Sequence, residues 1–180
     1  MKTATALLAC LFVLCAPAAF AEPPPALSSP FATVIAVPDD ARTLLVMSDT
    51  VRLLVSGAQT GGAYAVAEIV SPAGSGPPPH VHADEDEIFY VLEGSVELFD
   101  GEKRSIVGPG SVAVLPRGRV HGYRNAGTTP LRMLLVLAPA RFAQYFEALD
   151  KLGKDATPQR ATELGRDFHL QFMPPPQAPR

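Results

Sequence analysis

Two stretches of sequence decide the fold of this chain. Residues 74–94 read GSGPPPHVHADEDEIFYVLEG, and residues 110–125 read GSVAVLPRGRVHGYRN. In both, short apolar runs are broken by glycine and proline, which is typical of short strands joined by tight turns. Both stretches also contain histidine, of which the 180 residues hold only four.

The same strand pattern continues on both sides of these stretches. Between Phe31 and Pro139, apolar runs of about four to eight residues alternate with turn residues, as in a closed antiparallel barrel or a sandwich. The predicted strands are 33–37, 42–47, 51–56, 63–70, 87–92, 95–99, 103–106, 111–115, 120–124 and 131–137. A parallel α/β sheet would need helices between the strands, and no helical spacing occurs before Ala140. The sequence therefore predicts a mainly β fold.

The period of the apolar residues changes after Pro139. Aromatic and leucine side chains then recur at helical spacing, which predicts an amphipathic helix over residues 140–152. Thr157 as N-cap, Pro158 after it and Gly165 at the far end predict a second short helix. Residues 168–172 are expected to return as an edge strand before a loose tail over 173–180.

The N-terminal 21 residues have the layout of a secretory signal peptide. Lys2 precedes an apolar run over 6–16, and the small residues Ala19 and Ala21 follow. We expect cleavage near Ala21 and export to the periplasm or the medium, followed by a Pro-rich leader over 22–30. The apolar run is shorter than the ~20 residues of a spanning helix, so no integral membrane segment is expected. An acylated Cys10 is the less favoured alternative, because few residues precede it.

Charge and cysteine usage exclude some functions. The chain has 15 basic and 18 acidic residues, a formal net charge of −3 and no long basic run, so nucleic-acid binding is not expected. Both cysteines, Cys10 and Cys15, lie in the predicted signal peptide. The exported part should therefore contain no disulfide bond and no catalytic cysteine.

Three histidines fall at the ends of predicted strands. His80 and His82 are two residues apart, so extended backbone points both rings to one face, roughly 6 to 7 Å apart along the chain. Glu87 would point to the opposite face unless residues 83–86 loop or bulge, so the spacing predicts a break there. His121 can reach the same point only if the sheet closes on itself.

Three imidazoles and one carboxylate suit a divalent first-row metal ion, with one or two coordination positions left open for water or substrate. The alternative is that these are surface loop residues beside an acidic patch. On either interpretation Asp84, Glu85 and Asp86 are expected to be solvated loop charges.

The fixed positions carry a resemblance to a known family. The spacings are G-x5-H-x-H-x4-E-x6-G, from Gly74 to Gly94, and G-x5-P-x-G-x2-H-x3-N, from Gly110 to Asn125. They resemble the two signature motifs of the cupin superfamily, and the chain is similar to small single-domain cupins grouped with quercetin dioxygenase. This resemblance implies a double-stranded β-helix, or jelly-roll barrel, over 31–139, with C-terminal helices and a tail strand over 140–172 packed on it.

The resemblance also implies functional residues. It assigns His80, His82, Glu87 and His121 as metal ligands, and it gives Glu87 a catalytic role as base toward a substrate hydroxyl. The implied cofactor is one divalent transition-metal ion, and Fe, Mn, Ni, Cu, Co and Zn all suit this ligand set.

Several other side chains have two interpretations. Alternation would turn Phe89, Tyr123, Met133 and Leu135 toward the barrel interior, either around a metal or as ordinary core. For the polar residues the simpler expectations are an outward, solvated Glu68, exposed turn charges at Arg117 and Arg119, a turn-stabilising Asn125 and a structural His169. The alternative for Glu68 is an inward acid behind the metal ligands. Contacts from the two arginines to an anionic substrate are the alternative.

The sequence leaves the function open among three classes. One is a metal-dependent dioxygenase that acts on a small enol, catechol or phenol. The others are a non-catalytic module that binds a metal and a small ligand, and a metal-dependent isomerase or lyase. The expected partner is a small molecule, and a homodimer through an N-terminal strand at 31–37 is a further hypothesis.

Overall fold

The computed structural model describes residues 31–101 and 103–173. The chain divides at Pro30, and the part that begins at Phe31 contains the elements described below. The predicted signal peptide, the Pro-rich leader and nearly all of the predicted tail lie outside the described residues. Within them, no helix has the length and apolar character needed to cross a membrane.

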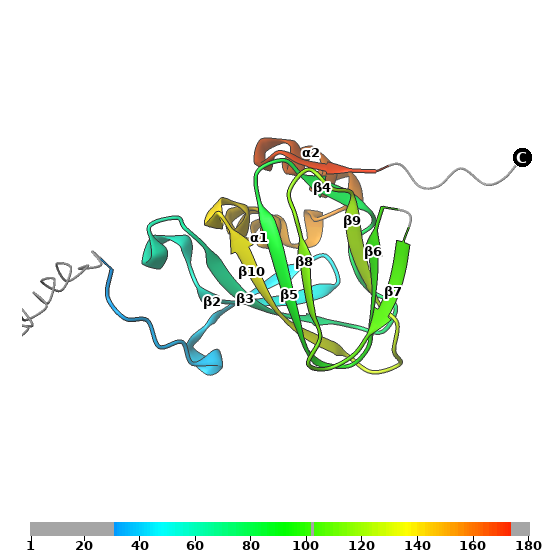
Figure 1. The fold of residues 1–180 in the computed structure, drawn as a ribbon. Helices are drawn as coiled ribbons and strands as arrows, with labels where there is room; N and C mark the ends of the chain where they lie inside the picture. The colour runs from blue at the N-terminus through cyan, green and yellow to red at the C-terminus, as the bar shows by residue number, and fades with distance from the viewer. Residues whose placement is uncertain (1–30, 102, 174–180) are drawn as a thin grey trace, which may run out of the picture. The chain divides into compact units, whose positions relative to one another are not determined.

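Six strands of the described chain form the first sheet, in the antiparallel order β1-β2-β3-β10-β5-β8 (Figure 1). They are β1 Arg42–Val46, β2 Asp49–Val55, β3 Ala65–Ser71, β10 Leu131–Ala138, β5 Asp86–Glu93 and β8 Val112–Leu115. β10 pairs with β3 on one side and β5 on the other. Its four inward side chains, Leu131, Met133, Leu135 and Leu137, are at most 1% exposed. The last strand of the barrel thus lies at the centre of the core.

Five strands from the described part of the chain form the second sheet, in the order β11-β4-β9-β6-β7. They are β11 Leu170–Phe172, β4 His80–His82, β9 His121–Asn125, β6 Val96–Asp100 and β7 Lys103–Val107. Buried side chains of this sheet, such as Val96 and Leu170, belong to the same hydrophobic core as those of the first sheet. Since apolar burial is the main favourable term in folding, this shared core holds the two sheets together.

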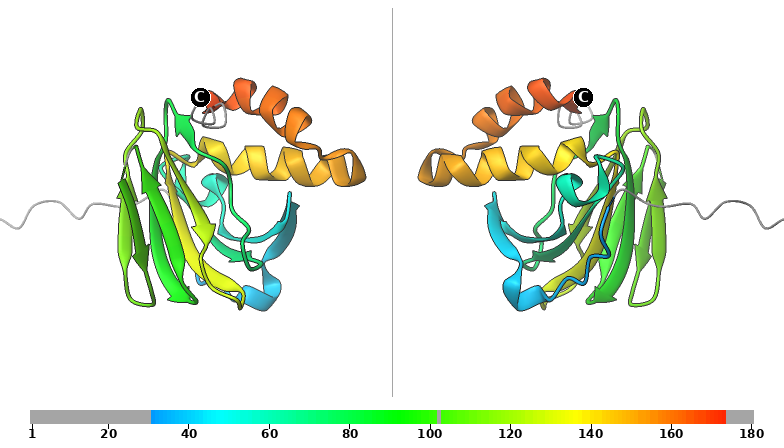
Figure 2. Two further views of the ribbon diagram at one scale, coloured as in Figure 1. Left: turned by 90° about the vertical axis from the view of Figure 1, so that its right-hand side faces the viewer. Right: turned by 90° about the vertical axis from the view of Figure 1, so that its left-hand side faces the viewer.

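Two short helices follow the barrel strands, as predicted. The 3-10 turn η3 (Ala140–Phe142) leads into α1 (Ala143–Leu152), and α2 spans Pro158–Gly165. The Oγ1 atom of Thr157 accepts a hydrogen bond from the backbone N–H of Arg160, which confirms the N-cap. Figure 2 shows the two helices together across one end of the sheets. The remaining 3-10 turns are η1 (Pro38–Asp40), η2 (Gly57–Thr60), η4 (Gly153–Asp155) and η5 (Arg166–Phe168).

The observed elements confirm the mainly β fold, and the predicted strands from Arg42 onward differ from the observed ones by at most two residues at either end. The strand predicted at 33–37 is wrong, because residues 32–37 have no regular structure. Within the described chain β1 pairs only with β2, so no neighbouring strand hydrogen-bonds to this segment. The short β4 was not predicted as a strand of its own, since it follows three prolines.

Candidate metal centre

Strand pairing brings the three histidines together. His80 and His82 are the first and last residues of β4, and β4 pairs with β9 through His80 and His121. This register places His121 directly beside the pair, although it lies 39 positions after His82 in the sequence. All three side chains are buried. The predicted closure of the sheet on itself is what assembles the cluster.

Glu87 joins the cluster because the backbone bends after β4. Residues 83–85 leave the strand, and β5 then starts at Asp86. The predicted break in extended structure is therefore confirmed. One ligand atom from each of His80, His82, Glu87 and His121 lies within 4.8 Å of the others.

The carboxylate of Glu87 lies between two of the imidazoles. Its Oε2 atom is 3.2 Å from Nε2 of His121, and its Oε1 atom is 3.7 Å from Nε2 of His82. Burial by itself raises the pKa of Glu87. The hydrogen bond to His121 and the nearby histidines outweigh it, so that the net shift is downward. Glu87 is consequently held as an ionised, metal-competent carboxylate.

The backbone fixes the orientation of two imidazoles. Nδ1 of His80 lies 2.8 Å from the carbonyl oxygen of Pro78, and Nδ1 of His121 lies 3.0 Å from that of Arg119. A carbonyl oxygen only accepts hydrogen bonds, so both Nδ1 atoms must carry the proton. Nε2 is then the nitrogen with which each ring can bind a metal ion. In the metal-free chain the Nε2 atom of His121 instead hydrogen-bonds to Oε2 of Glu87, so this contact would be exchanged for the metal ion.

His82 is fully buried, and neither of its ring nitrogens hydrogen-bonds to a described residue. Such orphaned polar atoms are costly unless a ligand satisfies them. Burial is also the main cause that lowers the pKa of His82, and it lowers the pKa of His80 to about 4. Neutral His80 and His82 beside an ionised Glu87 are in the protonation states that metal binding needs. The residues present therefore fit a single divalent transition-metal ion.

The acidic stretch 84–86, between His82 and Glu87 of the first motif, differs from expectation at one position. Glu85 was predicted to be a solvated loop charge, but its side chain is fully buried and neither oxygen hydrogen-bonds to a described residue. Its Oε2 atom lies 3.9 Å from Nδ1 of His82. The other two acids remain near the surface, where Asp84 pairs with His169 and Asp86 with Arg117. The bend that delivers Glu87 to the cluster also turns Glu85 inward.

A cavity of about 660 Å³ opens onto the four-residue cluster. This volume is in the range of small-molecule sites. The predicted interior residues Phe89, Tyr123 and Leu135 line it, whereas Met133 is buried in the core and is not among the lining residues. The helical region contributes further apolar wall, including Phe142, whose ring lies edge-on to His82 with centroids 4.2 Å apart. Sequence reasoning did not predict these helix-borne wall residues, because their spacing signals only an amphipathic helix.

The other polar candidates from the sequence, Arg117, Arg119 and Asn125, bond to neighbouring residues of the fold. Arg117 bonds to Asp86, and Arg119 bonds to Asp100, so the turn arginines are paired; neither lines the cavity. Asn125 holds its turn as predicted, since its amide donates to two backbone carbonyls and accepts from the N–H of Gly127.

The outward position of Glu68 is confirmed by the alternation along β3, yet its side chain is only 4% exposed. Arg52 and Arg132 cover it and pair with its carboxylate. The expectation that it is solvated is therefore wrong, because two long side chains from neighbouring strands lie over it.

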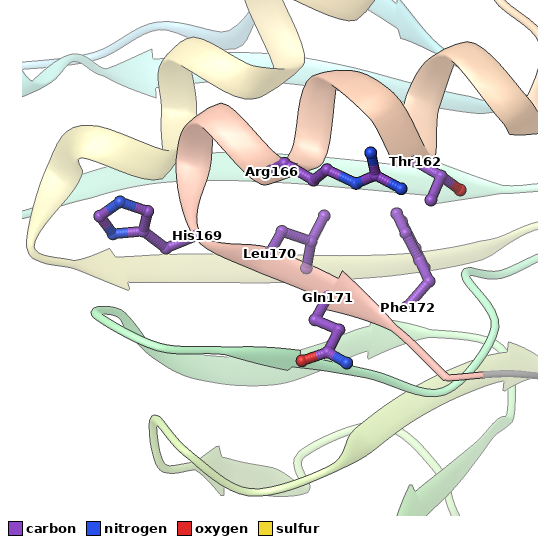
Figure 3. A pocket seen from close by; sticks show the side chains of 6 residues that line it. All are labelled: Thr162, Arg166, His169, Leu170, Gln171 and Phe172. Atoms are coloured by element: carbon purple, nitrogen blue, oxygen red, sulfur yellow. The ribbon is translucent and has the colours of Figure 1, made fainter.

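A smaller pocket of about 450 Å³ lies between α2 and β11 (Figure 3). It is lined by Thr162, Arg166, His169, Leu170, Gln171 and Phe172. Three of these residues, Thr162, Leu170 and Phe172, also line the large cavity, so the two hollows share this wall. None of the four clustered ligand residues lines the smaller pocket.

Comparison with known proteins agrees with the fold and the motifs. The cupin domain family profile matches residues 67–137, a range that contains all four clustered residues. Quercetin 2,3-dioxygenase of Bacillus subtilis is 28% identical over 138 residues, which cover 71% of this chain and 41% of the dioxygenase. The oxalate-binding protein of Thermotoga maritima is 33% identical over 85 residues, which cover 47% of this chain and 70% of that protein.

Among solved structures, the polyketide cyclase RemF of Streptomyces resistomycificus is similar with a TM-score of 0.53 and 28% identity. The match covers 59% of this chain and 80% of that one. The chain spans less than half the length of several curated relatives that it matches. All fixed positions of both motifs are present, and the two antiparallel sheets bring their histidines and glutamate into one buried cluster. Together with these similarities, this shows that the chain belongs to the cupin family.

Proposed function

We propose that this chain is an exported metal-dependent oxidoreductase of the dioxygenase type that acts on a small enol, catechol or phenol. The observation that carries the proposal is the buried cluster of three imidazoles and one carboxylate on the wall of a largely apolar cavity. The similarity to a quercetin 2,3-dioxygenase over 71% of the chain supports it.

His80, His82, Glu87 and His121 would hold the metal ion. When bound, the ion supplies a Lewis acid that favours the deprotonated form of a coordinated hydroxyl group and, if it is redox-active, a route for electrons to O2. The chain supplies the remaining functions. Glu87 can accept the proton of the substrate hydroxyl on a carboxylate oxygen, because burial between imidazoles holds this oxygen in place. The apolar walls exclude water from the bound substrate.

A non-catalytic binding function is the second candidate. The relative that the chain covers to 70% of its length is named an oxalate-binding protein. An isomerase, lyase or cyclase activity would use the same ligand set, and RemF is a polyketide cyclase with a similar fold. These candidates differ in one measurable property, which is substrate-dependent consumption of oxygen.

The first experiment is elemental analysis of the protein expressed with its own N-terminal segment, beside the His82→Ala variant. We expect about one equivalent of a redox-active metal in the parent protein and none in the variant. Oxygen uptake with quercetin and with catechol then separates oxidation from binding alone. Equal metal content in both proteins contradicts the ligand assignment, and metal without oxygen uptake favours the second candidate.

The proposed export is tested on the same sample. We expect the N-terminal residue of the exported protein to be Glu22, as determined by mass spectrometry. An exported protein that retains residues 1–21 would overturn the proposed cleavage near Ala21.

A further inference from the structure

We propose that Asp49 is a specificity-determining residue of the large cavity, which accepts a hydrogen bond from a hydroxyl group of an uncharged ligand and disfavours carboxylates. The proposal rests on the function proposed above, in that it names the substrate class of the same site. Asp49 is the first residue of β2, is 7% exposed and lines the cavity together with the four clustered residues.

Two hydroxyl groups donate directly to Asp49. Tyr123 Oη lies 2.6 Å from Oδ2, and Ser75 Oγ lies 2.6 Å from Oδ1. Both oxygens of this carboxylate therefore act as hydrogen-bond acceptors. Each oxygen retains a further lone pair with which it can accept a hydrogen bond from a ligand.

The outer hydroxyl groups are oriented by the same carboxylate. The single proton of Ser75 is directed at Asp49, so at 2.6 Å Ser48 must donate to Ser75. By the same argument Ser71 donates to Tyr123 across 3.2 Å. Four hydroxyl groups therefore form two chains of donors that both end on Asp49. The carboxylate is held at a fixed position by residues from separate elements of both sheets.

The charges around the cavity determine what can bind beside Asp49. Its acidic lining residues are Asp49 and Glu87, and no lysine or arginine is present among the described residues that line it. A ligand carboxylate would lose its hydration without gaining a cationic partner away from the metal cluster, which is costly in a low-dielectric site. A hydroxyl donor, in contrast, gains a charge-assisted hydrogen bond to Asp49.

The walls favour a flat apolar body for such a ligand. Aromatic rings of Phe89, Phe142, Tyr145, Phe146 and Phe172 line the cavity. The volume of about 660 Å³ accommodates more than one ring. The geometry thus favours an uncharged aromatic molecule whose hydroxyl donor meets Asp49 while another oxygen faces the metal cluster.

The test uses calorimetric titration of the full exported chain with quercetin, with unsubstituted flavone, which has the same rings without hydroxyl groups, and with oxalate. We expect quercetin to bind at least about tenfold more tightly than flavone, and oxalate more weakly than quercetin. In Asp49→Asn the preference for quercetin over flavone should fall about tenfold, while the affinity for flavone changes less than about twofold. Asp155→Asn, the same substitution at an exposed aspartate that does not line the cavity, is the matched control and should keep the preference.

Titrations are repeated after removal of metal by a chelator. The preference for hydroxyl donors should persist, because Asp49 and not the metal cluster produces it. A failure of this proposal can therefore be distinguished from a failure of the proposed oxidation, because the oxidation is tested by metal content and oxygen uptake. Equal binding of quercetin and flavone by the parent protein, no binding of quercetin, or tighter binding of oxalate would each overturn the proposal. These three results need no variant, so they apply even if Asp49→Asn does not fold.

Discussion

Glu85 and His82 face each other in the interior, and neither side chain hydrogen-bonds to a described residue. Oε2 of Glu85 lies 3.9 Å from Nδ1 of His82, and both side chains are fully buried. If Nε2 of His82 binds a metal ion, Nδ1 carries the proton and needs an acceptor. Glu85 is the acceptor that the fold supplies, and a shift of about 1 Å would complete the hydrogen bond.

We predict that Glu85→Gln weakens metal binding about tenfold or more, since loss of a partner to a ligating histidine has this effect in other metal sites. The measurement is a competition titration against a chelator of known affinity. Asp84→Asn, which removes a neighbouring acid that pairs at the surface with His169, is the control and should leave the affinity unchanged. An unchanged affinity in Glu85→Gln would show that Glu85 does not support His82.

The stability of the metal-free protein should fall as the pH drops from 6.5 to about 4. Burial lowers the pKa of His80 to about 4, so in this window the unfolded chain takes up a proton that the folded state does not bind. Complete loss of the contribution of His80 lowers the free energy of unfolding by about 3 kcal/mol. Urea unfolding at a series of pH values measures it, and a stability that stays constant between pH 6.5 and 4.5 would contradict the prediction.

The titration of Glu85 changes the free energy of unfolding in the opposite direction over part of this pH range. Burial, followed by the charge of Asp84, raises the pKa of Glu85 to about 6. Between about pH 6 and 4.5 the folded state therefore binds a proton before the unfolded chain does, which adds stability as the pH falls. In Glu85→Gln the acid-induced loss should be steeper than in the parent protein. An equal slope in both proteins would show that Glu85 does not titrate in this window.

Two glycines should respond differently to alanine. Gly118 has a φ of +75°, and its added Cβ would meet no atom within 4 Å, so Gly118→Ala should cost about 1 to 2 kcal/mol of unfolding free energy from backbone strain alone. Gly76 has a φ of +146°, and its Cβ would lie 2.2 Å from the carbonyl oxygen of Tyr123. Gly76→Ala should therefore cost about 3 kcal/mol or more. Thermal or urea unfolding ranks the two variants, and a larger loss for Gly118→Ala would contradict this order.

The edge strand β1 should depend on a side chain of α1. The backbone N–H of Leu45 donates to Oδ1 of Asp150 at 2.8 Å, and Arg42 also approaches this carboxylate. We predict that Asp150→Ala lowers the unfolding free energy by about 1 kcal/mol, because the hydrogen bond is lost. Asp155→Ala serves as the control, since the exposed side chain of Asp155 makes no hydrogen bond or ion pair among the described residues. Equal effects of the two substitutions would assign no specific role to Asp150.

Local pattern determined much of this protein. The short apolar runs between turn residues predicted the strands of the barrel, because glycine and proline interrupt extended structure within a few residues. Thr157, Pro158 and Gly165 marked the ends of α2 through capping chemistry that acts within a few residues. The spacing of His80, His82 and Glu87 predicted the bend after β4, since a fixed strand period leaves only a bend to bring Glu87 to the same face.

Only the tertiary structure decided the remainder. Residues 33–37 have an apolar pattern but no partner strand, and hydrogen bonds to a neighbour are what make a strand. Glu85 seemed a surface charge in an acidic run, yet the bend that delivers Glu87 buries it. Asp49 carries no signal in its own neighbourhood, because its partners Ser75 and Tyr123 come from elements 26 and 74 residues away. Local spacing can fix which residues share a face, but burial and long-range hydrogen bonds depend on how the two sheets close.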